Sequence, residues 1–114
     1  MRLNVIVKGT ALAMIVASAL VLSACSKSRE TRAAEACVAE FVAKIEKDRP
    51  YRADIAAIAA TAKAEGADLL VIESEATLDA AQANESKQKF LCRVQFDASK
   101  PDADPAVILF QFAF

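Results

Sequence analysis

The chain has 114 residues, with 14 basic side chains, 15 acidic side chains and no histidine. The missing histidine removes the commonest general base and the usual zinc ligand. The balanced charge argues against nucleic acid, which binds surfaces with a clustered excess of basic residues. We therefore expect no metal, no cofactor and no nucleic-acid partner.

The first 24 residues have the pattern of a secretory leader. Arg2 and Lys8 give a basic start, and the stretch 9–22 (GTALAMIVASALVL) is almost wholly apolar or small. This stretch is shorter than the roughly 20 residues that a membrane-spanning helix needs. Residues 1–24 are therefore predicted to be a signal peptide, and the rest of the chain is expected outside the cytoplasm.

The leader ends in an aliphatic residue, two small residues and a cysteine: Leu22, Ser23, Ala24 and Cys25. This tetrad resembles the lipobox of bacterial lipoproteins. The resemblance implies that residues 1–24 are removed and that Cys25 becomes the lipidated first residue. More than one acyl chain gives stable anchoring. In lipoproteins of Gram-negative bacteria an aspartate after the cysteine tends to retain the protein in the inner membrane. Ser26 in that position implies the outer membrane, on its periplasmic face.

Cleavage would leave about 90 residues, with 12 basic and 15 acidic side chains and a net charge of −3. Residues 25–28 are predicted to be the lipidated cysteine and a tether that reaches only about 10 Å. Residues 29–114 are predicted to form one small domain. Three basic residues near the anchor fit either an anionic lipid surface or an ordinary solvated helix start: Lys27, Arg29 and Arg32.

Two helices are predicted at the start of this domain. The segment 29–48 carries an apolar stripe at helical spacing: Ala34, Cys37, Val38, Phe41, Val42 and Ile45. Pro50 is expected to break this helix. The segment 51–65 is predicted to be a second, alanine-rich helix, with Gly66 as its C-terminal cap.

After Gly66 the apolar period changes to two, which predicts strands over 68–78, 87–97 and 106–114. The segment 79–86 is a polar connection, and 97–105 (DASKPDADP) has the composition of a loop. The predicted fold is an α+β domain with two N-terminal helices packed on a three-stranded, mostly antiparallel sheet (ααβββ).

Cys37 and Cys92 are predicted to form a disulfide. Cys37 shares a helix face with Phe41, and Cys92 alternates with polar residues on the apolar face of a strand, so both thiols point into one core. A secreted chain permits disulfides. Closing a loop of about 55 residues stabilises by about 4 kcal/mol in the chain-entropy model. The sequence lacks a Cys-x-x-Cys motif that would favour a redox pair.

Acidic residues offer the remaining candidates for chemistry. Glu73 and Glu75 share one face of a strand, and paired carboxylates can hydrolyse glycosidic bonds. A solvated strand face is the simpler interpretation. Three aspartates of one loop could hold calcium, although their spacing fits no EF-hand: Asp97, Asp102 and Asp104.

The last strand is unusually apolar. Alternation places Ile108, Phe110, Phe112 and Phe114 on one face and Val107, Leu109, Gln111 and Ala113 on the other. A strand with one wet face should have polar residues there. Either both faces are covered within the chain, or the second face docks a partner or a second copy.

The sequence therefore favours a non-enzymatic accessory lipoprotein of the bacterial envelope that acts by protein–protein interaction, with the second face of the last strand as the candidate surface. The alternative is a small-ligand-binding or enzyme-inhibiting periplasmic module, for which a pocket lined by Phe90, Phe96 and Phe110 would be evidence. A hydrolase using Glu73 and Glu75 requires a concave site around them. The partner and the oligomeric state remain open at this point.

Overall fold

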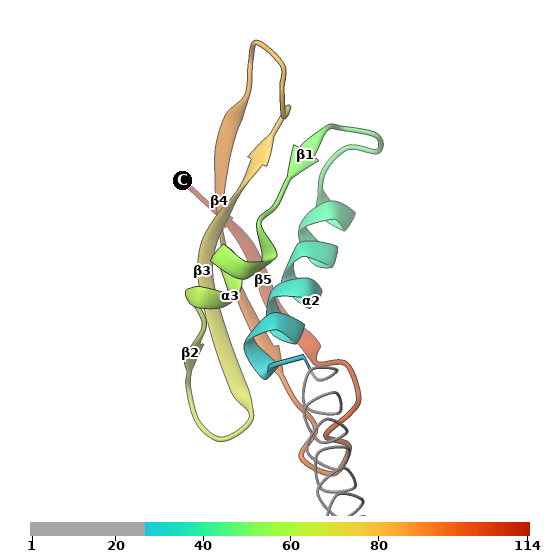
Figure 1. The fold of residues 1–114 in the computed structure, drawn as a ribbon, viewed down its shortest axis with the longest axis vertical. Helices are drawn as coiled ribbons and strands as arrows, with labels where there is room; N and C mark the ends of the chain where they lie inside the picture. The colour runs from blue at the N-terminus through green and yellow to red at the C-terminus, as the bar shows by residue number, and fades with distance from the viewer. Residues whose placement is uncertain (1–26) are drawn as a thin grey trace, which may run out of the picture.

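The structure is a computed structural model that describes residues 27–114. Within that range, two helices and a five-stranded antiparallel sheet enclose one core, and a disulfide joins the two layers (Figure 1). The predicted mixture of helices and antiparallel strands is confirmed, as is the disulfide. The predicted signal peptide and Cys25 lie outside the described residues.

The first helix, α2, spans Arg29–Lys44 and begins where a capping residue predicts it. The Ser28 hydroxyl accepts a hydrogen bond from the Thr31 backbone N–H at 3.1 Å, which satisfies a donor that the first turn leaves free. The helix ends at Lys44 rather than near residue 48. The chain then turns through Asp48, whose φ of 64° lies in the left-handed region that aspartate tolerates.

The second helix is much shorter than predicted. Helix α3 spans only Ile55–Ala60, with the Asp54 carboxylate accepting from the Ala57 N–H at 3.1 Å. Short strands flank it, β1 over Tyr51–Arg52 and β2 over Lys63–Ala64. The observed order is α2, β1, α3, β2, β3, β4, β5, so the two helices do not follow one another directly as the predicted layout had them.

Pairing with strand β3, which spans Leu69–Leu78, explains this difference. Tyr51 lies opposite Leu78 in the β1–β3 pair, and Lys63 lies opposite Val71 in the β2–β3 pair. Both short strands supply hydrogen-bonding partners to the same edge of β3, and this tertiary pairing outweighs the helix propensity of the alanine-rich segment. Gly66, with φ of 111°, serves the turn between β2 and β3 instead of capping a helix.

The three predicted long strands are present with small shifts at their ends. Strand β4 spans Ser86–Gln95 and β5 spans Ala106–Ala113, and the sheet order is β1-β3-β4-β5 with β2 also on β3. All pairs are antiparallel. Strand β5 therefore lies at the edge of the sheet opposite to the edge that β1 and β2 close.

A β-bulge in β5 changes the face of one predicted surface residue. Leu109 lies opposite Arg93, but the next pair joins Val107 to Val94, which leaves Ile108 as the extra residue. Val94 is fully buried, and Val107 packs against the same core. The prediction that Val107 shares a face with Leu109 was therefore wrong, because strict alternation cannot register an inserted residue.

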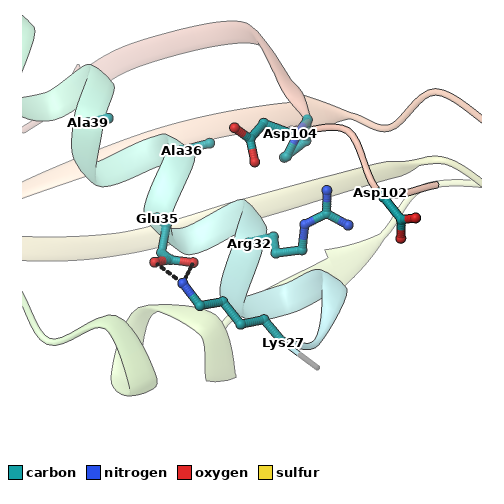
Figure 2. Close-up of a pocket in the computed structure, with 8 residues that line it drawn as sticks. Lys27, Arg32, Glu35, Ala36, Ala39, Asp102 and Asp104 are labelled. Atoms are coloured by element: carbon teal, nitrogen blue, oxygen red, sulfur yellow. Dashed lines mark hydrogen bonds and ion pairs between the residues drawn. The ribbon is translucent and has the colours of Figure 1, made fainter. Parts of the chain in front are cut away.

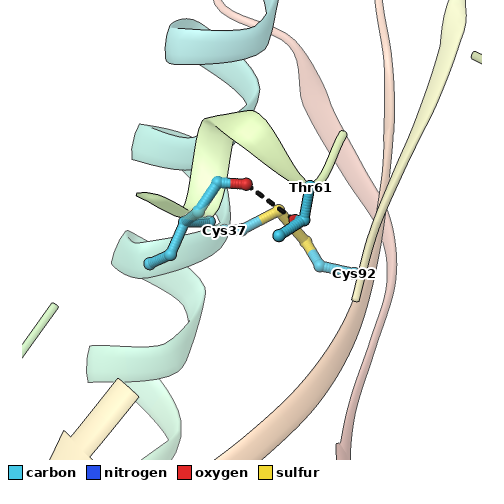
Figure 3. Close-up of a disulfide and its surroundings, with 4 residues drawn as sticks. Cys37, Thr61 and Cys92 are labelled. Carbon is cyan, nitrogen blue, oxygen red and sulfur yellow. Dashed lines mark hydrogen bonds between the residues drawn. A yellow bond between two sulfur atoms is a disulfide. The ribbon is translucent and has the colours of Figure 1, made fainter. Parts of the chain in front are cut away.

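The disulfide crosses the centre of the core. Cys37 on α2 and Cys92 on β4 are both fully buried, and their Cα atoms lie 6.1 Å apart (Figure 3). One turn further along α2, the Phe41 ring lies 5.9 Å from Phe90 and 5.6 Å from Phe112, measured between ring centroids. The disulfide and this aromatic contact together hold α2 against β4 and β5.

A cluster of hydrogen bonds around the β3–β4 turn holds the end of the molecule opposite to the start of α2. The Arg49 guanidinium donates two hydrogen bonds to the Asp79 carboxylate, at 3.0 and 2.9 Å, and Asn84 donates a third at 3.2 Å. The Asp79 N–H donates to the Pro50 carbonyl at 2.8 Å. The hydrogen bond from Arg49 lowers the pKa of Asp79 below its usual value, opposed by partial burial. The segment after α2 is thereby fixed to the β3–β4 turn.

Replacing both cysteines, Cys37→Ala with Cys92→Ala, should lower the free energy of unfolding by about 4 kcal/mol, because the unfolded chain regains the freedom of a loop of this length. A domain of this size has only about 5–15 kcal/mol in total. The measurement is the midpoint of chemical denaturation, with the exposed Ser86→Ala as a control. An unchanged midpoint in the double variant would contradict the structural role of the disulfide.

The Arg49–Asp79 pair should make stability depend on acid. Since the pKa of Asp79 is lower when folded than its unfolded value of about 3.9, its stabilisation is present above that value and is lost as pH falls through the folded pKa. Asp79→Asn should therefore be less stable than the natural chain at pH 6, and the gap should close towards pH 2. Thermal unfolding across this range measures it. A gap that stays constant with pH would count against the pair.

Candidate interaction surface

The outer edge of β5 is the most exposed apolar feature of the described chain. Within residues 27–114, β5 pairs on one side only, with β4. Its eight residues, AVILFQFA, include no charged residue and no proline. Ile108 is 52% exposed at the bulge, and Phe114 just beyond the strand is fully exposed. Edge strands of this kind are usually protected by charge, proline or a covering segment, and here only the bulge interrupts the edge.

Three of the four predicted surface residues lie together on the sheet face opposite the helices. Leu109, Gln111 and Ala113 face solvent in part or fully and lie next to Arg93, Leu91 and Lys89 of β4, respectively. The helices pack on the face that carries Phe110 and Phe112. On the other face Gln111 is exposed while Leu109 and Ala113 are half-buried, so this face of the last strand is covered only in part.

The same open face carries Glu73 and Glu75, and both side chains are exposed. Glu75 lies 3.8 Å from the Lys87 ammonium in an exposed ion pair. Neither glutamate lines the two grooves described below. The exposure and the ion pair of these residues fit the simpler interpretation, a solvated strand face.

The larger of these grooves has a volume of about 660 Å³ and lies between α2 and the 97–105 loop (Figure 2). Its lining is mostly charged or small: Lys27, Arg32, Glu35, Ala36, Ala39, Asp102, Asp104 and Pro105. Arg32 crosses it and donates to the Pro101 carbonyl at 2.9 Å and to the Ala103 carbonyl. Two of the five N–H donors of the arginine thus hold the loop beside the helix.

The three basic residues near the proposed anchor all have contacts within the chain. Lys27 pairs with Glu35 at 3.0 Å. Arg29 donates to the Ala67 carbonyl at 3.0 Å, and its guanidinium lies 4.4 Å from the centroid of the Phe96 ring. Arg32 approaches the same ring at 5.7 Å. These contacts tie two loops to the start of α2 and favour the structural interpretation over a lipid-binding one.

The three loop aspartates are not arranged as a cation site. Among the described residues, no group of three or more histidine, cysteine, aspartate or glutamate side chains could hold a metal ion. The Asp97 carboxylate accepts from both the hydroxyl and the N–H of Ser99, at 2.6 and 2.9 Å, which lowers the pKa of Asp97. Asp97 therefore serves the turn that begins the loop.

The aromatic pocket that would favour a small-ligand module is filled by its own side chains. Phe90 stacks on Phe110 with ring centroids 5.4 Å apart, and Phe41 and Phe112 complete the cluster. Phe96 lies outside this cluster, under the two arginines. The linings of the two grooves described here do not include Phe90, Phe96 or Phe110.

The sequence left open whether the last strand lies at an edge of the sheet, and in the structure β5 lies at one. The uncharged composition of 106–113 was the only signal of a free edge, since neither pairing partners nor edge position can be read from one strand alone.

No helix in residues 27–114 is long and apolar enough to cross a membrane. Comparison of the chain with family models, curated proteins and solved structures found no match.

Proposed function

We propose that this chain is an accessory lipoprotein of the bacterial envelope, held through Cys25 on the periplasmic face of the outer membrane, that acts by binding protein rather than by catalysis. The observation that carries the binding role is the unpaired, uncharged edge of β5 beside the open face with Leu109, Gln111 and Ala113. Main-chain groups on a free edge can add a strand from another protein, and alternate side chains can select it.

The proposed anchor would attach the domain to the membrane near one of its ends. The start of α2 and the 97–105 loop lie at one end of the molecule, and the β3–β4 turn lies at the other (Figure 1). Cys25 precedes Ser28, the cap of α2, by three residues, which span at most about 10 Å. The domain would therefore sit close to the bilayer, with β5 within reach of other membrane-bound proteins.

The alternative function, a ligand-binding or enzyme-inhibiting module, has one observation in its favour. The groove beside the 97–105 loop is large enough for a small molecule and carries both signs of charge. Its lining is mostly charged or small, and two of the five N–H donors of Arg32 are already bonded to the loop. We therefore place this function second, behind the edge-strand surface.

The lipid anchor predicts a simple chemical outcome. In a Gram-negative host, the full chain should incorporate labelled palmitate and lose residues 1–24, whereas Cys25→Ser should incorporate none and keep the mass of its leader. Mass spectrometry of the purified chain measures both. Ser26→Asp is the matched control, since it should keep the lipid and move to the inner membrane. Incorporation of label by Cys25→Ser would contradict the proposal.

The binding role predicts a specific covalent adduct. A photo-crosslinking residue at Leu109 in the anchored chain should yield discrete heavier bands in living cells, because this side chain lies on the proposed surface. The same residue at Ala56, exposed on α3, should yield none. Mass spectrometry identifies the captured protein. Equal, weak and diffuse adducts from both positions would contradict a specific surface on β5.

A further inference from the structure

The two edges of the sheet differ in strand pairing and in charge. The side of β3 that faces away from β4 pairs with β1 near one end and with β2 near the other. Arg52 of β1 and Lys63 of β2 also place charge along this edge. Within residues 27–114, no strand pairs with the outer side of β5, and β5 has no charged side chain. Among the described strands, β5 is therefore the one that offers a long edge with neither a paired strand nor a charged side chain to a partner that adds to the sheet.

We propose that β5 pairs antiparallel with β5 of a second copy of this chain, about a two-fold axis at Gln111. This inference deepens the proposed function, on which it rests, by naming the partner of the same surface. Residues directly opposite in an antiparallel pair share a face of the sheet. A strand can therefore pair with its own copy about any residue, and each choice fixes every other pair.

We place the axis at Gln111 because this register covers the exposed apolar residues of β5 and its end. It sets Ile108 of one copy opposite Phe114 of the other, and these are the two most exposed large hydrophobic residues in the described range. It also sets Leu109 opposite Ala113 on the open face, a large side chain beside a small one. On the helix side Phe110 meets Phe112, which would extend the aromatic cluster of each core across the interface.

Charge also favours a second copy over a charged partner strand. Residues 106–114 carry no charged side chain, so two copies meet without like charges directly opposite, which would be destabilising. A strand with charged residues would gain no ion pair from β5 itself and would bring charge against Phe110 and Phe112. At the axis, the two Gln111 side chains can donate to and accept from each other.

Anchoring constrains the orientation of such a dimer. The two-fold axis is perpendicular to the sheet, so the two α2 N-terminal ends point to opposite ends of the joined sheet. With a tether of only about 10 Å, both Cys25 residues reach one bilayer when the sheet lies parallel to the membrane surface. Each copy then presents the same face to the membrane, as a two-fold axis along the membrane normal requires.

Cysteine cross-linking in membranes tests the register. Gln111→Cys should form a disulfide-linked dimer, since residues on the axis have Cβ atoms about 5 Å apart. Leu109→Cys and Ala113→Cys should each stay monomeric alone, because equivalent residues then lie about 13 Å apart along the strand. Co-expressed with different tags, these two variants should cross-link to each other. Ala56→Cys on α3 reports random collisions.

A charge variant provides the second readout without a new thiol. Gln111→Lys places two ammonium groups opposite each other and should abolish the dimer, as should Gln111→Glu, whereas co-expression of the two should restore a mixed dimer. Gln111 is exposed, so neither change disturbs the core.

The outcomes separate this inference from the proposed function. Dimer formation by Gln111→Cys no greater than by Ala56→Cys would overturn the dimer, as would equal self-cross-linking at positions 109 and 111. If the photo-crosslinker at Leu109 then captures a different protein, the proposed binding role stands with another partner. If it captures nothing, both proposals fail.

Discussion

The Cys37–Cys92 disulfide is the contact on which the arrangement of this small domain depends. It joins the middle of α2 to strand β4 through two fully buried cysteines, so the helix is covalently tied to the sheet. Phe41, one turn further along α2, then meets Phe90, Phe110 and Phe112. Since a domain of this size buries only a modest part of its surface, one covalent tie placed at the centre has a large effect on stability.

The helices pack on one face of the sheet, so the two edges of the sheet must be covered by other segments or remain exposed. The edge of β3 is closed by β1 and β2, and Arg49 ties this segment to the β3–β4 turn through Asp79. No other described strand pairs with the outer edge of β5, and its bulge turns Val107 inward while exposing Ile108. The candidate surface is therefore the edge and open face of β5, which neither the helices nor β1 and β2 cover.

The parts that could be predicted from the sequence are those with a strong local signal. The core of the α2 stripe, the alternation of β4 and the inward direction of both cysteines follow from period and neighbours, and the structure confirms them. Two predicted members of the stripe differ, since Val42 is exposed and Ile45 lies just beyond the end of the helix. Tyr51 and Lys63 were predicted to be helical, but both lie in short strands that pair with the edge of β3. This pairing is a long-range effect, so the sequence of their own segment does not indicate it. The face of Val107 was missed for a related reason, since a bulge without glycine has no local signature.

Amide hydrogen exchange on the full chain tests the central claim, that the outer edge of β5 is free in the isolated protein and occupied in the envelope. The exchange of peptides from β5 would be compared between dilute, detergent-solubilised chain and native envelope vesicles, with β3 and β4 as internal references. The account predicts faster exchange in β5 than in β4 when the chain is dilute, and clear protection of β5 in the envelope. Equal exchange of β5 in both conditions would contradict it.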